Sequence, residues 1–167
     1  GDSVSILTWN VGYAGLGEES DFFMDGGKQV RAPSKAIVEK NMDGIVSIVK
    51  ELDADFTFLQ EIEADPSTRS YGIEAFVPYP IPPIGKVSSG IMTLSTAPIA
   101  SAERIALPSP FKWPVSVANL KRCLMPVYID LEGTDAQLVL VNLHLEAYDD
   151  GEGKAAQTAA LKSFLEQ

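Results

Sequence analysis

The chain has 167 residues, of which 46% are hydrophobic and 22% are charged, and its formal net charge at pH 7 is -10. This is enough apolar material for one substantial core, so we expect a single domain over residues 1–167. The negative charge argues against a large basic patch and predicts no stable non-specific binding of duplex DNA. The single cysteine, Cys123, excludes an intrachain disulfide, and its apolar neighbours indicate a buried structural thiol.

No run reaches the ~20 apolar residues of a membrane span, and no signal-peptide pattern opens the chain. The compartment and the oligomeric state stay open. A membrane anchor or a signal outside this sequence stays open as well.

The first third of the chain predicts a parallel strand–helix–strand unit. Residues 4–9 form an apolar run typical of a strand, and a long Gly-rich loop follows to about residue 33, a length that is more often functional than idle. Ser34 is a fair N-cap, and apolar residues at helical spacing predict an amphipathic helix that ends at residues 53–55. The run 56–59 then predicts a fully buried strand, parallel to the first because a helix crosses between them.

The middle and the end of the chain favour antiparallel strands and one more helix. Residues 76–83 are rich in proline, which central strands and helix interiors exclude, so we expect an extended loop there. Beyond it, runs at 89–94, 99–106, 123–131 and 138–143 alternate with turn signals and predict antiparallel neighbours. Residues 154–167 place apolar side chains on one face and predict a helix that packs back onto the sheet.

Three short polar signatures each close a strand-like apolar run. They are Trp9-Asn10, Gln60-Glu61 and Asn142-Leu143-His144. An amide, a carboxylate and an imidazole at the ends of buried strands indicate a site at one edge of a sheet, where open α/β sheets usually bind ligands. This arrangement is typical of an enzyme.

These signatures, together with Ser-Gly-Ile-Met at 89–92 and Leu145 after His144, occur in an order that resembles the endonuclease/exonuclease/phosphatase superfamily. The resemblance runs through nearly the whole chain, and a loop at 23–28 and a segment at 66–71 are similar to a group of bacterial members. It implies an α/β fold of the four-layer, deoxyribonuclease I-like sandwich type. It also implies hydrolysis of a phosphate ester with Mg²⁺, or with Mn²⁺ as the alternative.

The resemblance implies a role for each polar residue at the strand ends. Glu61 would be the Mg²⁺ ligand, since this cation prefers carboxylate oxygen and keeps several waters; the alternative is a solvated carboxylate or one that caps a turn. Asn10 would belong to the catalytic residues by hydrogen-bonding that carboxylate or a phosphate oxygen, and the alternative is a turn-forming asparagine.

His144, the only histidine, would be catalytic by donating a hydrogen bond to a phosphoryl oxygen or leaving group, whereas an isolated histidine is more often a satisfied core or surface group. Arg69 and Arg122 would bind the substrate, because guanidinium matches phosphate geometry; for both, an ordinary surface arginine is an equally good interpretation. The resemblance also places Asn142 among the substrate-binding residues.

The chain departs from the family pattern at two places. It lacks the later Gly-Asp-x-Asn strand end and the Asp-His pair, so it resembles the N-terminal part of a catalytic domain, and we expect this part by itself to be catalytically silent and only marginally stable. Where family members place a helix and a strand, between residues 61 and 89, it has a mostly Pro-rich segment. The alternative function is a non-catalytic phosphate- or protein-binding module that kept the fold. The substrate class stays open among nucleic acid, phosphoinositide, sphingolipid and nucleotide.

Overall fold

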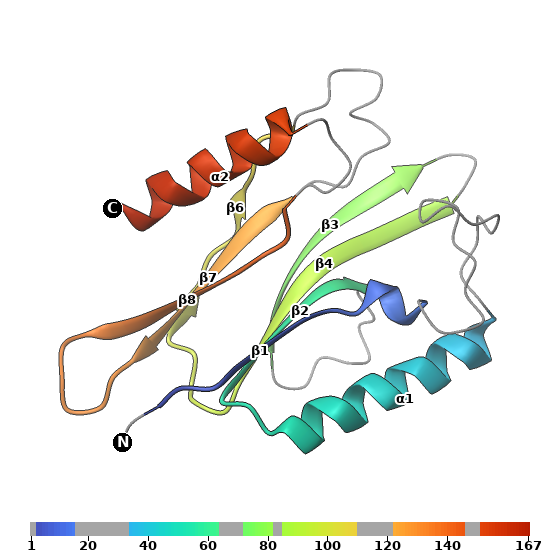
Figure 1. The fold of residues 1–167 in the computed structure, drawn as a ribbon, viewed down its shortest axis with the longest axis horizontal. Helices are drawn as coiled ribbons and strands as arrows, with labels where there is room; N and C mark the ends of the chain where they lie inside the picture. Colours follow the sequence, from blue (N-terminus) through green and yellow to red (C-terminus); the bar gives the residue numbers. More distant parts are fainter. Residues whose placement is uncertain (1–2, 16–33, 64–71, 82–84, 110–121, 146–150) are drawn as a thin grey trace.

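Two β-sheets and two long helices make up the part of the chain that the structure, a computed structural model, describes (Figure 1). This part comprises residues 3–15, 34–63, 72–81, 85–109, 122–145 and 151–167. The first sheet has the strand order β1-β2-β4-β3, and the second is centred on β7. The expected α/β class is confirmed.

The first sheet begins with a parallel pair that a helix connects. β1 (Ile6–Asn10) and β2 (Phe56–Glu63) pair in register from Ile6↔Phe56 to Asn10↔Gln60, and α1 (Lys35–Leu52) crosses between them. The helix ends where Asp53 adopts a left-handed conformation (φ 42) and its N–H donates to the Val49 carbonyl at 3.2 Å. The predicted strand–helix–strand unit is confirmed.

The expected loop over residues 76–83 is wrong for its described part, because β3 (Gly72–Ile81) is a strand antiparallel to β4 (Gly85–Ser95). β3 lies at the edge of the sheet, where a proline is tolerated if its missing N–H faces away from the neighbouring strand. Pro78 and Pro80 are two residues apart and so share one side of the strand. One orientation therefore leaves both missing donors outside the ladder.

The second sheet is antiparallel, as predicted. β7 (Cys123–Asp130) pairs along one side with β8 (Gln137–Leu143), from Leu124↔Leu143 to Asp130↔Gln137. The strand expected over 99–106 is split into β5 (Ser101–Ala102) and β6 (Ile105–Ala106), which pair with successive parts of β7. The ladder is interrupted opposite Pro126, whose carbonyl accepts from Glu103 N–H but which has no N–H to return the bond.

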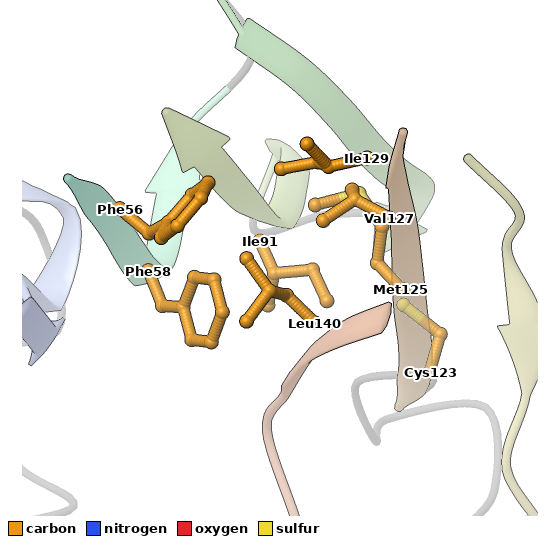
Figure 2. Close-up of a cluster of buried hydrophobic side chains, with 8 residues drawn as sticks. All are labelled: Phe56, Phe58, Ile91, Cys123, Met125, Val127, Ile129 and Leu140. Carbon is orange, nitrogen blue, oxygen red and sulfur yellow. The ribbon is translucent and has the colours of Figure 1, made fainter. Parts of the chain in front are cut away.

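The core fills the space between the two sheets (Figure 2). Its buried side chains come from β2, β4, β7 and β8: Phe56, Phe58, Ile91, Cys123, Met125, Val127, Ile129 and Leu140. The buried Cys123 thiol agrees with its predicted structural role, and burial raises its pKa. A second cluster lies between the other face of the first sheet and α1: Val11, Ala14, Ile45, Leu59 and Ile62. Helix, sheet and sheet are thus successive layers.

α2 (Glu152–Leu165) confirms the predicted C-terminal helix, and Ala160, Leu161 and Phe164 of its expected packed face are partly buried. Gly153 and Gln157 are its buried residues, and Gln157 Nε2 donates to the Pro108 carbonyl at 3.0 Å, which ties the helix to the segment after β6. Ala156 and Leu165, expected on the packed face, are exposed. Within the described residues, no helix has the length and apolarity needed to cross a membrane.

Ser5 and Asp55, which directly precede β1 and β2, bond to each other and fix the register of the two strands. The Asp55 carboxylate accepts from Ser5 N–H at 2.8 Å and from the Ser5 hydroxyl at 2.7 Å, while Asp55 N–H donates to Ser5 Oγ at 2.9 Å. Because the pairing is parallel, this register at residues 5 and 55 also decides which residues are neighbours at the far end of the strands. That far end carries the polar residues Asn10 and Gln60.

We predict that this pair makes the protein's stability acid-sensitive. The hydrogen bonds from Ser5 lower the pKa of Asp55 below its usual value of 3.8, so the contribution is fully present above that value and is lost as the pH falls through the lower, folded-state pKa. At pH 6, Ser5→Ala should melt at a lower temperature than the wild type. At pH 2 to 3, the difference between the two melting temperatures should be smaller. A difference that stays constant over that range would contradict the assignment. Ser47→Ala, at an exposed position of α1, is the control.

Candidate functional site

A β-bulge in β2 sets the position of Glu61. Gln60 pairs with Ile91 and Ile62 with Gly90, so two successive residues of β4 face three of β2, and Glu61 is the extra one. Its φ is 55, a left-handed conformation. Side chains alternate between the faces of a strand, and without the bulge Glu61 would follow Leu59 onto the α1 face. The bulge instead returns Ile62 to that face and frees the carboxylate to reach the second sheet.

Glu61 meets His144, which follows the end of β8. The distance from Glu61 Oε1 to His144 Nε2 is 3.6 Å, and the two side chains are 21% and 18% exposed. Both are therefore reachable from solvent, yet each is mostly enclosed. The end of β2 in the first sheet and the end of β8 in the second therefore lie together, whereas the sequence indicated the edge of a single sheet.

Arg122 contacts the same imidazole. It directly precedes β7, which starts beside the end of β8 because the two strands are antiparallel. Its Nη1 is 2.8 Å from Nδ1 and 3.3 Å from Nε2 of His144, and Arg122 is buried. The imidazole thus has both a guanidinium and a carboxylate close to it.

These contacts show how the ring is held. One atom, Arg122 Nη1, lies 2.8 Å from Nδ1 and 3.3 Å from Nε2, so the guanidinium faces the ring rather than the in-plane lone pair of one nitrogen. Arginine stacks on aromatic rings in this way. The Glu61 carboxylate lies 3.6 Å from Nε2, which is a charge contact rather than a hydrogen bond.

Asn10 ends β1, and the backbone two residues further on orients its side-chain amide. Gly12 N–H donates to Asn10 Oδ1 at 3.0 Å, which uses one of the two acceptor lone pairs of that oxygen. Asn10 is exposed, so the Nδ2 donors are the part of the amide that can act on a ligand. Donors suit an anion such as a carboxylate or a phosphate oxygen rather than a metal ion.

The chain leaves this strand end through a left-handed turn. Gly12, Tyr13 and Ala14 have φ values of 52, 56 and 53. Only glycine adopts this conformation freely, and each of the other two residues costs about 1–2 kcal/mol. Glu61 shares the same kind of strain on the neighbouring strand. Such residues cluster at functional sites when the surrounding structure holds them in place.

Asn142 does not lie where substrate could reach it, which corrects its predicted role. Its side chain is 0% exposed; Oδ1 accepts from Gln60 Nε2 at 2.9 Å, and Nδ2 donates to the Met92 carbonyl at 2.8 Å. Gln60 also approaches the Thr8 hydroxyl at 3.3 Å. Asn142 therefore joins the second sheet directly to β2 and β4 of the first, and through Gln60 to β1. The sequence motif located Asn142 and Gln60 but gave no signal that they face each other.

The donors present fit part of a magnesium site. Glu61 offers a partly exposed carboxylate, and Mg²⁺ is often held by one or two carboxylates with water and substrate oxygens completing its shell. No group of three or more histidine, cysteine, aspartate or glutamate residues with the geometry of a metal site occurs in the described ranges. Among the described residues, Glu61 suits the predicted metal role because its carboxylate is partly exposed. The predicted Arg69 lies outside the described residues.

Two packed sheets with a polar site at their shared end define a deoxyribonuclease I-like α/β sandwich. The Endonuclease/Exonuclease/phosphatase family profile matches residues 7–158. The chain therefore belongs to the endonuclease/exonuclease/phosphatase family, as its motifs suggested. It matches none of the curated proteins.

Solved structures show the same fold at low identity. An endonuclease/exonuclease/phosphatase from Beutenbergia cavernae is 16% identical with a TM-score of 0.66, over 96% of this chain and 43% of its own. The human Nocturnin catalytic domain with bound sulfate is 15% identical with a TM-score of 0.63, over 97% and 57%. ANGEL2, a 2',3'-cyclic phosphatase in complex with adenosine-2',3'-vanadate, is 15% identical with a TM-score of 0.63, over 98% and 49%. The chain thus spans roughly half the length of these structures.

We predict that Asn142→Ala destabilises the protein by about 2–4 kcal/mol, because it leaves the Gln60 amide and the Met92 carbonyl buried without this partner. Urea unfolding measures the loss. Val139→Thr, at an exposed position of the same strand, should stay within about 0.5 kcal/mol of the wild type. Equal stability of the two variants would show that the buried bridge contributes little.

Proposed function

We propose that the protein is a Mg²⁺-dependent phosphoric-ester hydrolase, a phosphodiesterase or phosphatase. The observation that carries the proposal is the bulge that turns Glu61 toward His144, in a chain of this family. Two of the similar structures hold oxyanions, sulfate in Nocturnin and a vanadate ester in ANGEL2, which supports a phosphate-like ligand. Mn²⁺ is the alternative cation.

Each described residue has a proposed task. Glu61 would hold Mg²⁺, which when bound supplies positive charge to a phosphoryl oxygen. Asn10 Nδ2 donates to a phosphate oxygen, while its Oδ1 accepts from Gly12 N–H. His144 donates a hydrogen bond to a phosphoryl oxygen or to the leaving group.

Arg122 acts mainly through His144 in this proposal. Arg122 is buried, and its Nη1 contacts the imidazole at 2.8 Å. This contact holds the ring in place near Glu61. Its positive charge also favours an anion in the same site.

The net charge of -10 favours a compact phosphate ester over extended duplex DNA as the bound species. A duplex requires several basic contacts along its backbone, whereas one ester group requires only local donors. We therefore place nucleic-acid duplexes outside the stable partners of this chain.

Glu61→Gln tests the proposal, because it keeps the shape of the side chain and removes its charge. In the full-length protein, the rate of Mg²⁺-dependent hydrolysis of bis(4-nitrophenyl) phosphate and of 4-nitrophenyl phosphate should fall by about tenfold to a hundredfold. Glu132→Gln, in the exposed turn between β7 and β8, should hydrolyse both at the wild-type rate.

Two results would count against the enzyme. Unchanged hydrolysis in Glu61→Gln would remove the metal role of that residue. Binding of inorganic phosphate by the wild type without turnover of either ester would favour the alternative, a phosphate-binding module.

A further inference from the structure

The turn after β1 is tied to α1 by a side chain that no motif singled out. Asn41 is half-buried on α1, and its Nδ2 donates to the Ala14 carbonyl at 2.9 Å. Ala14 is the last residue of the left-handed turn, and its own side chain is buried in the cluster beneath α1. Asn41 therefore holds the far end of a turn whose near end is Asn10.

Further hydrogen bonds tie the turn to itself, to β2 and to the Asn10 side chain. Ala14 N–H donates to the Val11 carbonyl at 2.9 Å, and Val11 N–H donates to the Gln60 carbonyl at 3.0 Å. Gly12 N–H, between them, donates to Asn10 Oδ1 at 3.0 Å. The direction of the Gly12 N–H depends on the left-handed backbone, and that N–H decides which end of the Asn10 amide faces outward.

The left-handed conformation is unfavourable for Tyr13 and Ala14, so contacts outside the turn must maintain it. The bond from Asn41 is suited to this, because it joins the strained segment to an 18-residue helix that packs on the sheet. A rigid element thus fixes a loop segment at the edge of the site.

We propose that Asn41 is a positioning residue for the site: it keeps the turn at residues 12–14 left-handed and thereby presents the Nδ2 donors of Asn10 to the phosphate group of the substrate. This rests on the proposed function. The helix residue acts only through Asn10 and touches no substrate.

Asn41→Ala and Asn41→Asp both remove the donor. Alanine has the higher helix propensity, so a loss of function in Asn41→Ala cannot come from a weaker helix, and aspartate keeps the shape of asparagine. Asp43→Ala, at an exposed position of the same helix, is the matched control. Asn41→Gln, which retains an amide donor, should recover part of any loss.

A double-mutant cycle with Asn10→Ala separates positioning from general stability. In the full-length protein, Asn41→Ala should lower kcat for bis(4-nitrophenyl) phosphate about tenfold, the size expected for misplacing one hydrogen bond. In the Asn10→Ala background it should have less than a twofold further effect. Effects that multiply in the double variant would overturn the proposal.

Amide hydrogen exchange gives a second readout that needs no activity. In Asn41→Ala, Gly12 and Ala14 N–H should exchange about tenfold faster, while core amides such as Val127 should keep their protection. Unchanged exchange at Gly12 would overturn the proposal. If the wild type hydrolyses neither ester, the proposed function fails, and the exchange result still decides whether Asn41 holds the turn.

Discussion

The position of the site depends on the buried amide bridge between the two sheets. Asn10 and Glu61 come from the first sheet, and Arg122 and His144 come from the second, so the site exists only when the sheets are correctly aligned. Apolar packing holds the sheets together but is non-directional, and it permits small lateral shifts. The hydrogen bonds of Asn142 to Gln60 and to the β4 backbone are directional. They also lie where a shift would leave buried polar groups without partners.

The bulge in β2 performs a second alignment. Alternation along the strand places Phe56, Phe58 and Gln60 toward the second sheet and Leu59 toward α1. One extra residue at the strand end lets Glu61 stay on the inter-sheet side without moving Ile62 out of the cluster beneath α1. A carboxylate on the α1 side would enter that apolar cluster, where a charge is expensive. The bulge therefore keeps Ile62 in the apolar cluster and Glu61 in the site at the same time.

Much of the fold followed from local patterns. The β1–α1–β2 unit and the β7–β8 hairpin have apolar periodicity and turn residues that act over short distances, so the sequence predicted them. The strand β3 was missed because proline content excludes a central strand, while the edge position that permits it depends on the neighbouring strands.

The site residues follow the same division. Glu61, His144 and Asn10 were singled out because each closes an apolar run, a signal that is visible along the chain. The bulge was not visible, since it is a mismatch between two strands rather than a property of one. The burial of Asn142 and the contact of Arg122 with His144 arise from pairings across 82 and 22 residues. No local pattern in a single sequence carries such pairings.

The candidate site contains a buried positive charge, whereas the chain as a whole is negatively charged. A protein with net charge -10 repels an anionic ester at long range, but this repulsion is screened beyond about 8 Å at physiological ionic strength. Inside that distance the substrate meets local groups, and buried charges are screened much less than exposed ones. Arg122 is buried, so its positive charge acts within the site, where water does not weaken it. A buried arginine beside the imidazole would therefore let an acidic chain hold a phosphate group at the proposed site, and only there.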